Sequence, residues 1–185
     1  MTTFVLVHGA MHGSWCWDRV AKPLRDKGHH VETVDMPGRP GGPQIPGPDL
    51  ASYAATVTAA VDRCDEPVVL VAHSLGGIAC VEMLIEQELP EVKLFVTAGS
   101  QSPYFYEIGA LRTLPFKANV TCKLPAHFPK WVNFYDRRDF LSFVGRGVFG
   151  AKVTDKEVNN GQPFPQSHSA YWSNDAVWKT IKECL

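Results

Sequence analysis

Residues 67–78 read PVVLVAHSLGGI, and this stretch decides the fold of the chain. Its first six residues form a short, continuously apolar run, as in a strand buried on both faces of a sheet. Ile78 opens an apolar stretch with helical spacing, so the chain must turn sharply between strand and helix. A turn of this kind closes only when the residues two before and two after its central residue are small. Ala72 and Gly76 meet that need, which places Ser74 at the apex of a predicted strand–turn–helix unit.

Ser74 is the candidate nucleophile of this unit. A serine at such an apex lies at the N-terminus of a helix, where free backbone N–H groups and the helix dipole favour a developing negative charge. The plainer interpretation is a glycine-rich turn that binds a phosphate. That interpretation is disfavoured because the turn lacks the lysine or the Gly-x-Gly-x-x-Gly pattern that usually accompanies phosphate binding.

Strand and helix patterns alternate on both sides of residues 67–78. Strands are predicted at 3–8, 30–34, 67–72, 92–97, 131–135 and 152–158, and helices at 15–25, 49–64, 78–87 and 171–184. Apolar strands that alternate with helices predict an α/β fold, with a mostly parallel sheet covered by helices on both faces. Residues 101–130 have no clean period and are expected to form a short lid or pocket-covering insertion. Residues 1–185 are expected to form one domain.

Composition and charge exclude several classes of function. The 185 residues are 45% hydrophobic and carry a formal net charge of -1, with Lys and Arg scattered along the chain. No nucleic-acid partner and no anionic membrane surface is therefore expected. No apolar run approaches the roughly 20 residues of a membrane helix, and the N-terminus does not read as a signal peptide, so a cytoplasmic location is expected. The five cysteines form no Cys-x-x-Cys pair, and neither a metal nor a cofactor is expected. The sequence leaves the oligomeric state open.

The chain resembles the α/β-hydrolases over nearly its whole length. Residues 7–15 (VHGAMHGSW), 28–29 (GH) and 35–38 (DMPG) are similar to the plant methylesterase and hydroxynitrile lyase family and its bacterial relatives. Residues 72–77 (AHSLGG) are similar to the elbow of the minimal Bacillus-type lipases, in which alanine replaces glycine. Those lipases are also short and lack a cap domain. The resemblance implies an α/β-hydrolase fold with a minimal cap or none.

The resemblance also implies a catalytic triad in the chain order nucleophile, acid, base. Of the two histidines after Ser74, His127 precedes the strand expected to carry the acid, so His168 is the expected base. The family usually places the acid after an aromatic residue and a turn of three residues, which favours Asp139. Asp136 remains the alternative acid.

In such folds the oxyanion is held by backbone N–H groups, here those of Leu75 and Ala10. Only about 30 residues separate Ser100 from the acid-bearing strand, too few for the large helical cap of the methylesterases. An open or partly covered cleft is therefore expected. The side chains expected to line it are Met11, Tyr104, Phe105 and Tyr106.

The reaction follows from comparison with the family. Members that cleave cyanohydrins carry threonine at the position of Gly9 and lysine directly after the catalytic histidine, where this chain has Ser169. A carboxylic ester hydrolase that acts on small or medium apolar esters through an acyl-enzyme is therefore predicted. Thioester and amide cleavage are less favoured. The alternative from another class is a protein of the same fold that binds a small molecule or a partner and turns over little.

Overall fold

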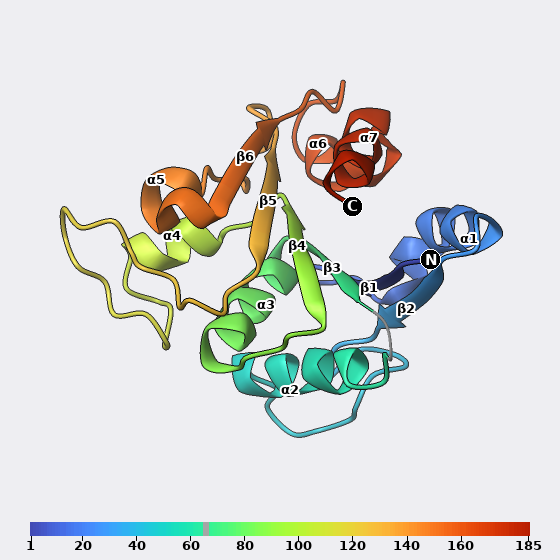
Figure 1. Cartoon of the computed structure of the whole chain (residues 1–185), viewed down its shortest axis with the longest axis horizontal. Coiled ribbons are helices and arrows are strands. Elements are labelled where there is room, and N and C mark those ends of the chain that lie inside the picture. Colours follow the sequence, from blue (N-terminus) through green and yellow to red (C-terminus); the bar gives the residue numbers. More distant parts are fainter. Residues whose placement is uncertain (65–66) are drawn as a thin grey trace.

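The computed structural model describes residues 1–64 and 67–185 (Figure 1). Its strands pair in the order β2-β1-β3-β4-β5-β6, and each neighbouring pair is parallel. The strands are β1 (Thr3–Val7), β2 (His30–Val34), β3 (Val68–His73), β4 (Val92–Ala98), β5 (Lys130–Tyr135) and β6 (Val153–Glu157). The predicted α/β fold with a parallel sheet is confirmed. Because all described strands run the same way, the loops that follow them gather at one edge of the sheet.

Helices cover both faces of this sheet (Figure 1). They are α1 (Asp18–Asp26), α2 (Leu50–Val61), α3 (Leu75–Glu86), α4 (Ser102–Glu107), α5 (Arg146–Phe149), α6 (Gln166–Ser169) and α7 (Asp175–Cys184). Short 3-10 helices occur at Ser14–Trp17, Gly150–Lys152 and Ala170–Ser173.

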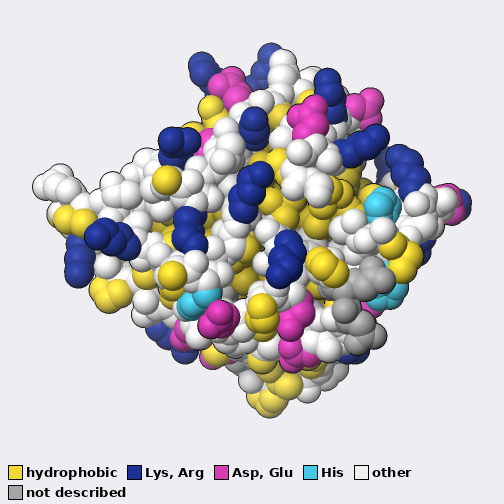
Figure 2. Space-filling view, viewed as in Figure 1, with side chains coloured by type: hydrophobic (Ala, Val, Ile, Leu, Met, Phe, Trp, Pro, Cys, Tyr) yellow, Lys and Arg dark blue, Asp and Glu magenta, His cyan; other side chains and the backbone are white. Residues whose placement is uncertain are grey.

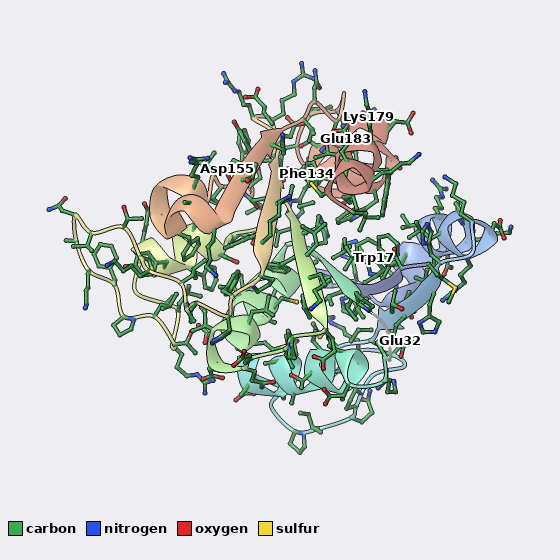
Figure 3. All side chains as sticks on the ribbon, in the orientation of Figure 1. Trp17, Glu32, Phe134, Asp155, Lys179 and Glu183 are labelled. Atoms are coloured by element: carbon green, nitrogen blue, oxygen red, sulfur yellow. The ribbon has the colours of Figure 1, made fainter. Side chains whose placement is uncertain are left out.

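Alternate residues of the strands supply the two hydrophobic layers. Val5 and Val7 of β1 belong to the cluster that includes buried residues of α2 and α3. Phe4 and Leu6 belong to the other cluster, which also holds Trp17 and residues of α1 and α7. Trp17 lies between the sheet and α1 in Figure 3. The period of two along a strand thus divides one apolar run between two separate cores.

The bounds of several helices differ from the sequence predictions. Helix α3 begins at Leu75 and not at Ile78, because the chain passes directly from Ser74 into the helix through two glycines. The predicted helix at 15–25 is a 3-10 turn followed by α1. The predicted helix at 171–184 is likewise divided at Asn174, whose side chain accepts a hydrogen bond from the Ala176 N–H at 3.1 Å and caps α7.

Residues 101–130 contain a helix that their sequence pattern did not predict. Helix α4 is six residues long, too short to show a helical period, and residues 108–129 continue as a loop beside α4 and α5 (Figure 1). Glu82 of α3 fixes this loop, since its buried carboxylate accepts a hydrogen bond from the Arg112 N–H at 2.8 Å. The Cys122 N–H donates to the Val148 carbonyl at 2.8 Å and holds the loop at its far end.

The surface of the molecule carries charges of both signs. Dark blue and magenta side chains are spread over the face in Figure 2, and apolar side chains are visible in the hollow between α7 and α1. Within residues 1–64 and 67–185, no helix is long and apolar enough to cross a membrane.

Candidate active site

Ser74 lies at the turn between β3 and α3 in a strained backbone conformation. Its φ of 53° and ψ of -126° fall in a region that non-glycine residues rarely adopt, at a cost of about 1–3 kcal/mol. Two backbone hydrogen bonds hold the turn, from the Ser74 N–H to the Ala98 carbonyl at 3.0 Å and from the Gly77 N–H to the Ser74 carbonyl at 2.9 Å. The predicted strand–turn–helix unit is present, with Ser74 at its apex.

Glycines allow the loop after β1 to pack directly on this turn. A Cβ atom at Gly9 would lie 2.8 Å from the Ser74 Cβ, and one at Gly76 would lie 2.5 Å from the His8 carbonyl oxygen. Any larger side chain would separate the two segments. This close approach brings Ala10 and Leu75 together in the wall of one small pocket.

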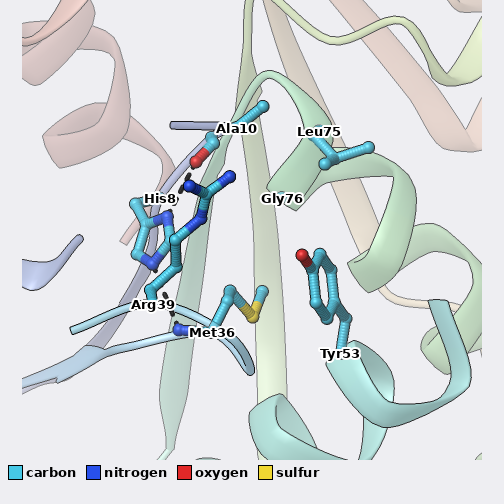
Figure 4. A pocket seen from close by; sticks show the side chains of 8 residues that line it. His8, Ala10, Met36, Arg39, Tyr53, Leu75 and Gly76 are labelled. Carbon is cyan, nitrogen blue, oxygen red and sulfur yellow. Dashed lines mark hydrogen bonds between the residues drawn. The ribbon is translucent and has the colours of Figure 1, made fainter. Parts of the chain in front are cut away.

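The pocket beside Ala10 and Leu75 has a volume of about 10 Å³, roughly the space of one water molecule (Figure 4). The ends of the Arg39 and Tyr53 side chains are directed toward it in Figure 4. His8 closes another side, and it donates from Nδ1 to the Gly9 carbonyl at 2.8 Å and accepts from the Met36 N–H at 3.1 Å. Burial lowers the pKa of His8, so this histidine remains neutral and serves to hold the loop.

Asp139 and His168 form a close pair on the loops after β5 and β6. His168 Nδ1 lies 2.9 Å from Asp139 Oδ2. The buried carboxylate also accepts hydrogen bonds from the Leu141 N–H at 3.0 Å and from the Tyr171 hydroxyl at 2.8 Å. Burial acts to raise the pKa of Asp139, but the bond to His168 and these two donors outweigh it and hold the pKa below its usual value. Asp139 is therefore ionised at neutral pH.

Asp136, the alternative acid, has other partners. Its carboxylate accepts hydrogen bonds from the Arg138 N–H at 2.9 Å and from the Asn160 N–H at 2.6 Å. The first bond makes it a turn aspartate, and the second ties its loop to the loop after β6. The structure thus places Asp139, and not Asp136, against His168.

Gly99 and Gln101 lie where these groups meet. A Cβ atom at Gly99 would lie 2.9 Å from the His168 ring and 3.1 Å from Asp139 Oδ2. Gln101 Nε2 donates to the carbonyls of Gly99 and Leu141, both at 2.8 Å, and lies 3.4 Å from Ser74 Oγ. In the described part of the chain, no hydrogen bond joins Ser74 Oγ to His168. A nucleophile and its base often form that bond only when substrate is present.

His73 and Tyr171 support the pair in ways that the sequence did not reveal. His73 Nε2 donates to the His168 carbonyl at 2.6 Å, and the two rings lie 4.7 Å apart. Burial, together with the neighbouring His168, lowers the pKa of His73 to about 3, so it stays neutral. The Tyr171 hydroxyl accepts from the Asp136 N–H at 3.0 Å while it donates to Asp139. Tyr171 lies more than 30 residues from both aspartates, so no local pattern could have shown this bridge.

The side chains expected to line the cleft fall into two groups. Met11 and Tyr104 are exposed, at 82% and 43% of their surface. Phe105 packs against the hydrophobic cluster, and Tyr106 is buried with its ring 5.7 Å from that of Phe149. Tyr106 is therefore a core residue in this structure, because α4 turns its side chain inward.

The described residues contain no group of three or more His, Cys, Asp or Glu side chains arranged to hold a metal ion.

Comparison with known proteins establishes the family. A model of the alpha/beta hydrolase family matches residues 4–183. This chain belongs to the alpha/beta hydrolase family. Methylesterase 18 of Arabidopsis thaliana is 41% identical over 78 residues, which cover 40% of this chain and 30% of that protein. Methyl jasmonate esterase 1 of Vitis vinifera is 37% identical over 108 residues, which cover 55% of this chain and 41% of that protein. In both cases the match spans less than half of the relative's length.

Solved structures agree on the fold. Polyneuridine aldehyde esterase superposes with a TM-score of 0.70 at 16% identity, over 99% of this chain and 99% of that chain. Tomato methylketone synthase I, in complex with 2-tridecanone, gives a TM-score of 0.70 at 15% identity, over 98% of this chain and 96% of that chain. The predicted α/β-hydrolase fold and the resemblance to the methylesterase group are confirmed. The likeness of the elbow to that of the Bacillus-type lipases stays a prediction.

Proposed function

We propose that this chain is a carboxylic ester hydrolase with Ser74 as nucleophile, His168 as general base and Asp139 as the partner of His168. The observation that carries the proposal is the 2.9 Å contact between His168 and Asp139, formed around Gly99 beside the strained Ser74 turn. A nucleophile, a base and a group that orients the base are the parts that acyl transfer requires.

The first half of the reaction forms an acyl-enzyme. His168 Nε2 takes the Ser74 hydroxyl proton as Oγ attacks the ester carbonyl carbon. Asp139 keeps the proton of His168 on Nδ1 and stabilises the imidazolium that forms. The tetrahedral intermediate collapses, the bond to the alkoxy group breaks, and His168 returns the proton to the leaving alcohol. A water molecule activated by His168 then hydrolyses the acyl-enzyme and releases the carboxylic acid.

The small pocket beside Ala10 and Leu75 supports the proposed oxyanion site. Its volume of about 10 Å³ suits one oxygen atom, and it lies at the N-terminus of α3, where N–H groups are free. The Arg39 guanidinium, half-exposed in the wall of the pocket, adds positive charge on the same side. Backbone donors at Leu75 and Ala10 would stabilise the oxyanion more than the planar ester, which lowers the barrier.

The proposed substrates are small or medium esters with apolar acyl groups. Two of the relatives, methylesterase 18 and methyl jasmonate esterase 1, have names that refer to methyl esters. The exposed Met11 and Tyr104 offer apolar surface near the loops after β1 and β4. Methyl esters of short carboxylic acids are therefore the first substrates to test, with thioesters and amides as comparisons.

Labelling with a small fluorophosphonate tests the nucleophile without a choice of substrate. Intact-mass analysis should show one adduct per chain, and peptide mapping should place it on Ser74. Ser74→Ala should remove the adduct, and Ser173→Ala, a change at an exposed serine, should retain it. Folded protein that forms no adduct on Ser74 would contradict the proposal.

One observation favours a second candidate, a protein that binds a small molecule and turns over little. Ser74 Oγ has Gln101 Nε2 as its hydrogen-bonding neighbour, and His168 does not reach it in this structure. Labelling distinguishes the two candidates, because a serine without an active base reacts slowly.

A further inference from the structure

A groove between α1 and α7 is separate from the small pocket beside Ala10 and Leu75. Its volume is about 800 Å³, and it lies between elements that Figure 1 shows on the same side of the sheet. Apolar side chains form its floor, and some of them are visible between α7 and α1 in Figure 2. These side chains are Phe4, Val20, Leu24, Trp172, Trp178 and Ile181. We call this feature the α1–α7 groove.

The rim of the α1–α7 groove is positively charged. Arg19 and Lys27 line it from α1 and the residue after α1, and Lys179 and Lys182 line it from α7. Figure 3 shows Lys179 on α7. Among the described residues none of these four cations forms an ion pair, and the acidic side chain that lines the groove is Asp175. The groove therefore has an excess of unneutralised positive charge above an apolar floor.

The size of the α1–α7 groove favours a small ligand over a protein. Its 800 Å³ lies within the range of about 300–1,000 Å³ that is typical of small-molecule sites. A stable protein interface usually buries about 800 Å² on each partner, a much broader surface. An apolar floor of two tryptophans under a cationic rim fits a molecule with a hydrocarbon part and one anionic group.

We propose that the α1–α7 groove binds an amphiphilic carboxylate, with its alkyl chain on Trp172, Trp178 and Ile181 and its carboxylate among the rim lysines. The site is independent of the proposed hydrolase function, because it shares no lining residue with the pocket beside Ala10 and Leu75. Binding in the groove is therefore expected whether or not Ser74 is reactive.

Binding of dodecanoate, below its micelle concentration, tests this site by tryptophan fluorescence and calorimetry. One saturable site per chain is expected, with a shift in emission because Trp172 and Trp178 line the groove. Hexanoate should bind at least about ten-fold more weakly, since it buries six fewer methylene groups. Dodecyltrimethylammonium has an alkyl chain of nearly the same length and the opposite charge, and it should also bind at least about ten-fold more weakly.

Two double variants locate the site. Lys179→Gln with Lys182→Gln should weaken dodecanoate binding at least about five-fold, and both positions are exposed, so the fold is retained. Lys117→Gln with Lys123→Gln makes the same change in net charge outside the groove and should leave binding unchanged. Equal binding by the two double variants would place dodecanoate elsewhere, including the Ser74 cleft, and would overturn the proposal.

Light scattering tests whether a second copy of this chain occupies the α1–α7 groove. A mass of two chains, together with no saturable dodecanoate binding, would favour a second copy of the chain over a small ligand as the occupant of the groove. That result, or an absence of binding by a monomer, would also make the proposal wrong.

Discussion

Gly99→Ala perturbs the proposed site at a single atom. Gly99 has a φ of 60°, and the added Cβ would lie 2.9 Å from the His168 ring and 3.1 Å from Asp139 Oδ2. Nonbonded heavy atoms normally lie about 3.5–4.0 Å apart, so the His168–Asp139 pair must move by about 0.6 Å or more. A displacement approaching 1 Å reduces turnover by up to about 100-fold, and we expect a loss of about ten-fold to 100-fold in kcat.

Gly28→Ala is the matched control for backbone strain. Gly28 has a φ of 82°, and an added Cβ would meet no atom within 4 Å. An alanine in the left-handed region costs about 1–2 kcal/mol at either position. In a chain of this size that corresponds to a decrease in Tm of roughly 2–8 °C. Both variants should therefore lose stability, while only Gly99→Ala should lose activity.

The measurements are the Tm, the rate of fluorophosphonate labelling at Ser74, and kcat for a methyl ester. Labelling and turnover should fall together in Gly99→Ala and remain close to the parent values in Gly28→Ala. If folded Gly99→Ala labels at the parent rate, the His168–Asp139 geometry does not activate Ser74, and the reasoning from Gly99 fails.

Three further changes test other parts of the structure. In the folded protein the pKa of His73 is lowered to about 3, whereas in the unfolded chain it is about 6.5. The unfolded state therefore takes up a proton as pH falls below about 6.5 and the folded state does not. The free energy of unfolding in urea should decline from pH 7 to pH 5. His73→Gln should reduce that decline, and an unchanged pH dependence would exclude His73 as its source. Tyr171→Phe removes a hydrogen-bond donor to Asp139. The free energy of unfolding, measured in denaturant, should fall by about 1–2 kcal/mol, and kcat should fall several-fold. An unchanged kcat would show that Asp139 does not need this hydrogen bond. Glu82→Ala leaves the Arg112 N–H without its acceptor, so stability should fall by about 1–3 kcal/mol and limited proteolysis within residues 108–129 should accelerate; an unaltered digest would contradict this role.

Local patterns were sufficient to predict the sheet. Runs such as residues 68–72 are apolar and buried at every position, as expected for a strand that lies between two helical layers. The same local reasoning was less successful with short elements. Helices α4, α5 and α6 have six, four and four residues, less than the two turns needed to show a helical period.

The chemistry of the site was predicted only in part. Ser74 followed from the residues around it, because a tight turn restricts its neighbours to small side chains. His168 and Asp139 followed from the resemblance to a family, and the structure then placed them 2.9 Å apart. Their catalytic roles stay predictions until labelling and variants test them.

The sequence by itself determined the order of strands and helices, the apex serine and the family, because each depends on residues close together in the chain. Only the tertiary structure decided that Asp139, and not Asp136, contacts His168, that Tyr171 bridges the two aspartates and that Tyr106 points into the core. These contacts join segments that lie up to 35 residues apart or depend on which way a short helix turns a side chain. Sequence spacing does not encode such distances, since they are set by how the loops pack at the edge of the sheet.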